Sequence, residues 1–172
     1  MKKLLALMLC TLSFMSMANS DVAQVNIPEK VLTLNKALCP ELNSEELYTE
    51  VMDVGHGKTI YLLTCELYAY NSMSRAYMVN SLGDVSVLSV MEIDYRGEMY
   101  ATNSLMGGSL DIATKSLNTF SKGRGVGDCG QTATYSYDSD LETFVLKEYR
   151  LKATCDGEYE DEWPVIYPAQ AK

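Results

Sequence analysis

Four of the five cysteines are spread through the chain after its apolar N-terminal segment, and they constrain its fold more than any other feature. Cys39, Cys65, Cys129 and Cys155 lie far apart in the sequence, and their number is even. In an oxidising compartment such a set forms two disulfides, and three pairings are possible. A structural zinc site would need cysteines close together or several histidines, whereas His56 is the single histidine. We therefore expect two disulfides, no metal site and no cofactor.

The N-terminal segment predicts export to such a compartment. Two lysines precede an apolar run over residues 4–17, and small residues at positions 18 and 20 suit cleavage before Asp21. We expect a signal peptide at residues 1–20, which removes the fifth cysteine, Cys10, and a single disulfide-bonded domain at residues 21–172. A buried N-terminal helix is the alternative. No other apolar stretch approaches the roughly 20 residues of a membrane helix, so we expect no membrane insertion of the mature chain.

The predicted mature chain is strongly acidic. Without Lys2 and Lys3 the 14 basic residues become 12 against 23 acidic residues, so the formal charge changes from -9 to -11. Such a charge repels nucleic acid and attracts cationic partners, although solubility alone is a simpler explanation of it. We expect no nucleic-acid partner, and we place the protein in the periplasm, with secretion as the alternative.

One short helix is predicted immediately before Cys39. Apolar residues recur at helical spacing, with Asn26 as the candidate N-cap, Pro28 in the first turn and Pro40 beyond the end. The apolar positions are Ile27, Val31, Leu34 and Leu38.

Strand patterns dominate the rest of the chain. Apolar residues that include Met91 and Ile93 alternate with Glu92 and Asp94 over residues 85–96, and a turn at residues 96–97 leads into residues 98–102. Two further hairpins are predicted over residues 51–65 and 132–151. A second helix over residues 43–52 is an alternative to the start of the first of these. The predicted fold is mainly β, of the α+β class: an antiparallel sheet or small sandwich with one short N-terminal helix.

Several fragments imitate catalytic motifs without the context that the chemistry requires. Residues 125–130 fit the dinucleotide-binding pattern, and residues 55–59 the end of a phosphate-binding loop, but both lead into strand patterns. His56 is expected at an exposed hairpin tip. No pattern singles out a pair of carboxylates for glycan hydrolysis, so we assign no catalytic residue. Residues 158–162 are acidic, but they lack the spaced acids and the central glycine of a calcium loop. The carboxylates considered are Asp128, Glu142, Asp156 and Glu158.

Four short motifs follow one another in a fixed order. They are Cys65 with Ala69-Tyr70-Asn71, then Lys122-Gly123-Arg124-Gly125-Val126-Gly127-Asp128-Cys129-Gly130, then Cys155-Asp156-Gly157, and finally Glu162-Trp163-Pro164-Val165. In these motifs the chain resembles the bacterial family known as domain of unknown function 1176. Many members are longer and have more cysteines, so the resemblance is mainly to the C-terminal part of the family. It implies an envelope location and disulfides, but no chemistry.

The resemblance also bears on the disulfide pairing, because it keeps Cys129 and Cys155 within one block of motifs. A bond between Cys39 and Cys65, and one between Cys129 and Cys155, would each join the start of one segment to the end of a neighbouring strand. We therefore predict the disulfides Cys39–Cys65 and Cys129–Cys155.

The glycine-rich stretch is the predicted focus of the site, because Arg124 and Asp128 are held close together there and Cys129 anchors the loop. In one interpretation Arg124 is an internal brace that pairs with an acid such as Asp128. In the other it faces a cleft and contacts a ligand. The predicted binding residues are Tyr70, Asn71, Arg124, Asp128 and Trp163.

These features favour a non-enzymatic binding or interaction protein of the periplasm. One alternative is an inhibitor of a cationic enzyme such as lysozyme, because an acidic surface complements a cationic cleft. The other is a carboxylate hydrolase that acts on envelope glycans. The corresponding partners are a cationic protein or an envelope glycan.

Overall fold

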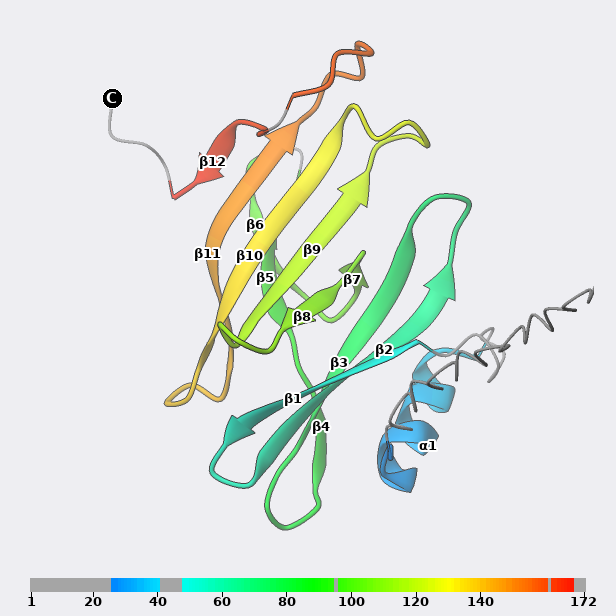
Figure 1. Cartoon of the computed structure of the whole chain (residues 1–172), viewed down its shortest axis with the longest axis vertical. Helices are drawn as coiled ribbons and strands as arrows, with labels where there is room; N and C mark the ends of the chain where they lie inside the picture. The colour runs from blue at the N-terminus through cyan, green and yellow to red at the C-terminus, as the bar shows by residue number, and fades with distance from the viewer. Residues whose placement is uncertain (1–25, 41–47, 95, 161, 169–172) are drawn as a thin grey trace, which may run out of the picture.

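The computed structural model describes residues 26–40, 48–94, 96–160 and 162–168. The predicted signal peptide with Cys10 lies outside these residues, and so do residues 43–47 of the alternative second helix. The described chain is mainly β with one short helix and antiparallel sheets, which confirms the predicted fold class (Figure 1). No helix in this part of the chain is long and apolar enough to cross a membrane.

The helix α1 (Glu29–Leu38) lies where the sequence predicts it, but it begins differently. Pro28, and not Asn26, occupies the N-cap position, and its carbonyl accepts hydrogen bonds from the backbone N–H groups of Val31 and Leu32. Proline suits this place because its fixed φ lets the chain enter the helix, and the N–H that it lacks would have no partner within the helix.

The buried face of α1 departs from the predicted one at its end. Val31 is fully buried against Leu63 and Tyr77, whereas Leu38 is 38% exposed. Asn35 is buried in its place, because its side-chain oxygen accepts a 2.7 Å hydrogen bond from the Tyr77 hydroxyl. A satisfied polar group thus occupies a position one turn after Val31.

The first sheet receives α1 on one face. It has the order β1-β2-β3-β4, with β7 also paired to β3, and the predicted first hairpin is confirmed as β1 and β2 with His56 exposed at its turn. Residues 49–52 lie in β1, so the helical alternative is wrong for its described part. The strands are β1 (Thr49–Gly55), β2 (Lys58–Leu67), β3 (Ser72–Val79), β4 (Val85–Val87) and β7 (Leu105–Met106).

The second sheet has the order β12-β11-β10-β9-β8, and every strand pair in it is antiparallel. The predicted hairpin over residues 132–151 is confirmed as β10 and β11. The strands are β8 (Ser109–Asp111), β9 (Ser116–Lys122), β10 (Gly130–Asp138), β11 (Thr143–Lys152) and β12 (Val165–Tyr167).

The remaining predicted hairpin is present, but it is shorter than expected. Its strands are β5 (Val90–Ile93) and β6 (Met99–Thr102), while β4, predicted as part of the same strand, pairs with β3 of the first sheet. The predicted alternation is wrong at two positions, because Met91 is 42% exposed and Glu92 only 8% exposed. Glu92 tolerates burial because Tyr100 and Gln131 donate hydrogen bonds to its carboxylate.

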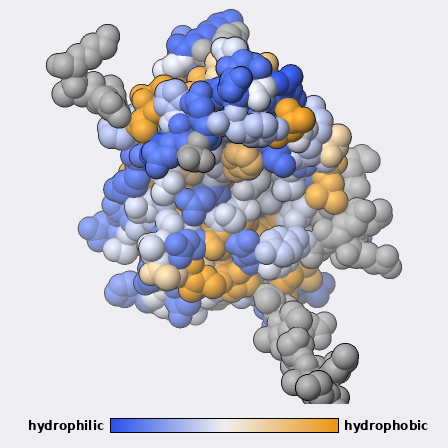
Figure 2. Space-filling view, turned by 45° about the horizontal axis from the view of Figure 1, so that its top comes forward, coloured by the Kyte–Doolittle hydropathy of each residue, from blue (hydrophilic) through white to orange (hydrophobic). Residues whose placement is uncertain are grey.

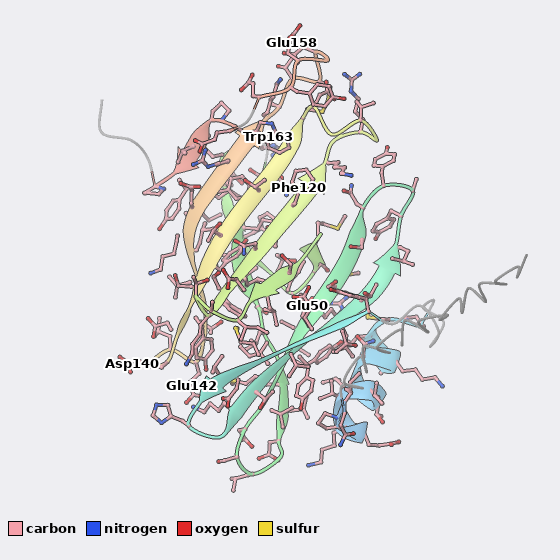
Figure 3. All side chains as sticks on the ribbon, viewed as in Figure 1. Glu50, Phe120, Asp140, Glu142, Glu158 and Trp163 are labelled. Atoms are coloured by element: carbon pink, nitrogen blue, oxygen red, sulfur yellow. A yellow bond between two sulfur atoms is a disulfide. The ribbon has the colours of Figure 1, made fainter. Side chains whose placement is uncertain are left out.

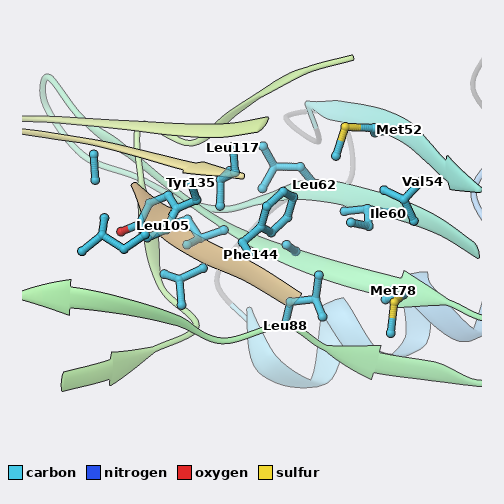
Figure 4. Close-up of a cluster of buried hydrophobic side chains, with 14 of the residues drawn as sticks. Met52, Val54, Ile60, Leu62, Met78, Leu88, Leu105, Leu117, Tyr135 and Phe144 are labelled. Atoms are coloured by element: carbon cyan, nitrogen blue, oxygen red, sulfur yellow. The ribbon is translucent and has the colours of Figure 1, made fainter. Parts of the chain in front are cut away.

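The core lies between the two sheets. Leu62 and Met78 of the first sheet pack in one cluster with Tyr135 and Phe144 of the second (Figure 4). The β5–β6 hairpin joins this cluster from behind the second sheet in Figure 1, and Tyr149 donates a 2.8 Å hydrogen bond to the carbonyl of Ile93. Among the described elements, none covers the opposite, outer face of β9, β10 and β11 (Figure 1).

Two disulfides pair the cysteines in the predicted way. Cys39, at the end of α1, is joined to Cys65 in β2, and Cys129, immediately before β10, is joined to Cys155 after β11. Such bonds persist in the periplasm and outside the cell, so they fit a protein of one of those compartments.

Candidate functional site

A row of three side chains crosses the outer face of the second sheet. Thr132 in β10 lies opposite Phe120 in β9 on one side and opposite Arg150 in β11 on the other. Because side chains alternate along a strand, Ala133 and Tyr135 share one face of β10, and Thr132, between them and the strand's start, lies on the other. The odd positions, Ala133 and Tyr135, lie in the core, so Phe120, Thr132 and Arg150 face outwards.

Trp163 lies against this row. The centroids of the Trp163 and Phe120 rings are 5.7 Å apart, with their planes inclined by 32°. Arg150 fixes the segment that carries the tryptophan, because its Nη1 donates to the Trp163 carbonyl at 3.3 Å. Trp163 itself is 9% exposed, whereas Phe120 is 39% exposed, so Phe120 presents the more accessible ring.

The charges of the row are already paired. The guanidinium of Arg150 lies 2.6 Å from Glu148 and 3.0 Å from Glu162. Hydrogen bonds to these two carboxylates hold the pKa of Arg150 above its ordinary value. The guanidinium therefore stays charged and fixed in place, where it can still share its donors with a ligand.

These residues form an open groove of about 290 Å³ on the outer face. Figure 3 labels Phe120 and Trp163 side by side over the upper half of the sheet. Tyr159 and Glu160 complete the groove from the segment after β11. It thus combines exposed aromatic surface with a threonine, a guanidinium and two carboxylates; the side chains are Phe120, Thr132, Arg150, Tyr159, Glu160, Glu162 and Trp163.

The segment that carries Tyr159 and Glu160 is anchored at several points. Lys152 is only 7% exposed, and its Nζ lies 3.0 Å from Asp156 and 3.4 Å from Glu160. The same Nζ donates a 2.5 Å hydrogen bond to the Glu158 carbonyl. The pKa of Lys152 is raised by its carboxylate partners and that of Asp156 is lowered by the lysine. Residues 156–160, the acidic segment, are therefore held in one shape by a buried cation.

Asp128 connects the glycine-rich loop to the same segment. It is 1% exposed, accepts a 2.7 Å hydrogen bond from Nε of Arg124 and also contacts Nη2 of that side chain. The backbone N–H of Gly157 donates a further 2.6 Å bond to its carboxylate. The Arg124 guanidinium holds the pKa of Asp128 far below its usual range. These are the contacts that the brace interpretation of Arg124 requires.

Tyr70 and Asn71 join the first sheet to this loop. The amide of Asn71 donates to the Lys122 carbonyl at 3.0 Å and accepts from the Lys122 N–H at 2.9 Å. The ring of Tyr70 lies so close to Gly125 that a Cβ added there would be 3.4 Å from it. The connection between β2 and β3 is thus fastened to the end of β9.

The structure divides the predicted site residues into two neighbouring groups. Tyr70, Asn71, Arg124 and Asp128 surround the glycine-rich loop, whereas Trp163 lies in the groove. The two groups are linked where Tyr159 donates to the Val126 carbonyl at 3.3 Å. The sequence analysis did not predict three groove residues in the strands and three in the segment after them: Phe120, Thr132, Arg150, Tyr159, Glu160 and Glu162. Alternation along residues 130–138 is the signal that would have found Thr132.

Three of the carboxylates considered for catalysis, Asp128, Asp156 and Glu158, lie around residues 156–158, whereas Glu142 lies apart. Glu142 pairs with Lys58 at the opposite end of the second sheet from Trp163 (Figure 3), and Asp128 is buried. Within residues 26–40, 48–94, 96–160 and 162–168, no three His, Cys, Asp or Glu side chains gather as a metal site.

Comparisons with known proteins give a family and a relative. Residues 14–170 match the family described as "Protein of unknown function (DUF1176)". The uncharacterized protein YpfG of Escherichia coli (strain K12) is 29% identical over 113 residues, which cover 64% of this chain and 32% of that protein. The chain therefore spans about a third of this relative. No solved structure matches this chain.

Proposed function

Because the chain belongs to the DUF1176 family, whose description assigns no chemistry, we propose a function from the groove: an exported, non-enzymatic protein that binds an envelope glycan there. The single observation that carries the proposal is the Phe120–Trp163 pair, set among hydrogen-bonding side chains on an uncovered sheet face. The disulfides support the exported location.

The chemistry of a sugar ring matches this arrangement. A pyranose has one or both faces lined by C–H groups, which pack on an aromatic ring, and hydroxyls around its edge, which donate and accept hydrogen bonds. Phe120 supplies the accessible ring, while Thr132, Glu160 and Glu162 supply donors and acceptors at the rim. Small-molecule sites commonly combine apolar walls with a few such polar groups.

Binding without hydrolysis is favoured by the state of the nearby acids. Glycan hydrolysis by two carboxyls needs one that stays protonated, which requires a raised pKa. The pKa of Asp156 is lowered by Lys152, and the carboxylates of Glu160 and Glu162 face Lys152 and Arg150. Glu92, whose pKa burial raises, bonds to Gln131, which lies on the inner face of β10.

The fluorescence of Trp163 provides the test, because it is the only tryptophan in the sequence. Titration with soluble peptidoglycan glycan fragments is expected to give a saturable fluorescence change. Phe120→Ala should weaken binding at least about tenfold, because it removes the accessible ring while leaving the core intact. Tyr48→Ala is the control, since Tyr48 is a 66% exposed aromatic that does not line the groove.

A glycan that produced neither a fluorescence change nor heat of binding at millimolar concentration would overturn the proposal. An unchanged affinity of Phe120→Ala would move any binding away from the groove.

A second candidate, inhibition of a cationic enzyme, is favoured by a different observation. The acidic segment projects beyond the strands, with Glu158 near its tip in Figure 3, and Lys152 and the Cys129–Cys155 disulfide anchor it. Hydrophilic residues cover most of this end of the molecule (Figure 2). Assays of lysozyme inhibition and of soluble sugar release with the same sample separate the three functions: inhibition supports this candidate, and release supports a hydrolase.

A further inference from the structure

We propose that the ligand is an oligosaccharide that continues from the groove along the outer face of the second sheet, over a second row formed by Asn118, Thr134 and Glu148. This inference rests on the proposed glycan binding and specifies the class of glycan. It assigns a site to residues that lie outside the groove itself.

Strand register places the second row next to the first. Thr134 lies opposite Asn118 in β9 and opposite Glu148 in β11. Each of these residues is two positions along its strand from a member of the first row, so it projects from the same face. Two residues of an extended strand span roughly 7 Å, a distance comparable with the length of one sugar unit.

The second row presents hydrogen-bonding groups in an ordered arrangement. Thr134 donates to the side-chain oxygen of Asn118 at 3.1 Å, and Nε of Arg150 donates to Glu148 at 2.6 Å. The threonine and asparagine are therefore oriented by each other, and the glutamate by the guanidinium of the groove. Because these side chains are already ordered, a ligand that binds them loses less side-chain conformational entropy than it would on freely rotating side chains.

The groove and the row are continuous through Arg150. Its guanidinium bonds to Glu148 of the second row and to Glu162 of the groove. At the other end of the groove, Tyr159 and Glu160 form a wall from the anchored acidic segment. A chain seated on Phe120 is thus bounded on one side and open towards Asn118 and Thr134 on the other.

Polar side chains are ordinary on a solvent-facing antiparallel sheet, so polarity alone carries no site. The distinguishing feature is that the row begins at an aromatic platform and shares a charged side chain with it. In the next row Ser136 lies opposite the buried Ser116 of β9 and opposite Val145 of β11, so the polar surface ends after the second row. An extended ligand rich in hydroxyls matches this sequence of surfaces better than a compact one.

Isothermal titration with N-acetylglucosamine oligomers of one, two, four and six units tests the inference. Affinity should rise at least about tenfold between the dimer and the tetramer and then level off. The double variant Asn118→Ala/Thr134→Val should bind the tetramer no more tightly than the dimer, while its dimer affinity stays unchanged. Ser86→Ala is the control, because Ser86 is an exposed residue of β4 in the other sheet.

The outcomes distinguish the inference from the function on which it rests. Equal affinities for dimer, tetramer and hexamer, or a double variant that binds the tetramer like the unmodified protein, would overturn the extended site and leave glycan binding intact. Phe120→Ala should weaken the binding of every oligomer. If the unmodified protein binds none of the oligomers, glycan binding fails and the extended site fails with it.

Discussion

Asp128 shows how one buried side chain organises the end of the second sheet. Its carboxylate contacts Arg124 in the glycine-rich loop and the N–H of Gly157 in the acidic segment, while its neighbour Cys129 forms a disulfide with Cys155. A buried carboxylate is stable only when it is paired and hydrogen-bonded, and here both conditions are met. Removing its cation should therefore expose the cost of its burial.

We expect Arg124→Ala to lower the melting temperature by on the order of 5 °C at neutral pH, because Asp128 loses its cation while it remains buried. The pKa of Asp128 is lowered in the folded state, so this stabilisation is fully present above the pKa of an unfolded aspartate and is lost progressively as the pH falls from there through the folded pKa. The difference from the unmodified protein should therefore shrink below about pH 4.

Thermal melts at neutral and acidic pH measure this effect, with Lys36→Ala as an exposed cation control on α1. If Arg124 contacted a ligand instead, Arg124→Ala would leave the melting temperature unchanged and would abolish ligand binding. That pair of results would refute the brace.

At the level of elements, the sequence predicted the hairpins that combine alternation with turn residues. Gly55 and Gly57 take positive φ in the β1–β2 turn, where a side chain would be strained, and this is the signal on which that prediction depended. The strands β3, β7, β8, β9 and β12 were not predicted. β9 carries Asn118 and Phe120 on its outer face, a mixed pattern, and β12 has only three residues, so pairing with neighbours and not local preference makes them strands.

The candidate site was likewise predicted only where short sequence motifs mark it. The glycine-rich motif led to Arg124 and Asp128, which lie near each other in sequence and bond to each other, and a separate motif led to Asn71, which bonds to Lys122. The groove depends on register between β9 and β10, which a single sequence does not specify once β9 is missed.

The β5–β6 hairpin contains a carboxyl that is more costly to bury charged than neutral. Burial raises the pKa of Glu92, and the hydroxyl of Tyr100 and the amide of Gln131 oppose the shift by donating to it. A raised folded pKa means that this group stabilises the fold below its unfolded pKa, and that the contribution is lost as the pH rises through the folded pKa.

Glu92→Gln should therefore raise the melting temperature by a few degrees at pH 8, because it removes the cost of burying the charged form, and change it little at pH 4. An amide retains one acceptor for Gln131 and can donate to the Tyr100 oxygen, so both contacts persist. Urea or thermal unfolding at the two pH values measures the change. A variant that is less stable than the unmodified protein at pH 8 would contradict the expectation.

For the whole molecule, the two disulfides hold different parts of the sandwich. Cys39–Cys65 attaches α1 to the first sheet, whereas Cys129–Cys155 attaches the segment with Tyr159 and Glu160 to the second. Both have a sequence separation of 26, so chain entropy assigns each about 3.5 kcal/mol of stability. Equal loops thus predict similar losses of stability but different losses of function.

Paired Cys→Ser variants should show this division. Each should lower the free energy of unfolding by about 3.5 kcal/mol, but only Cys129→Ser/Cys155→Ser should also weaken glycan binding, because it loosens the wall of the groove. Denaturant unfolding and Trp163 fluorescence titration measure the two effects. Equal loss of binding in Cys39→Ser/Cys65→Ser would contradict this separation.

The irregularity of β11 bears on how the molecule behaves among its own copies. On the side away from β10, the ladder partners of β11 in the described chain are confined to Tyr149 and Arg150, beside β12. A bulge between the pairs of Thr134 and Tyr135 leaves Lys147 as an extra, exposed residue on this strand. A bulge with a charged residue makes an open edge a poor template for another strand. Edge-to-edge pairing through β11 is therefore disfavoured when the protein is concentrated.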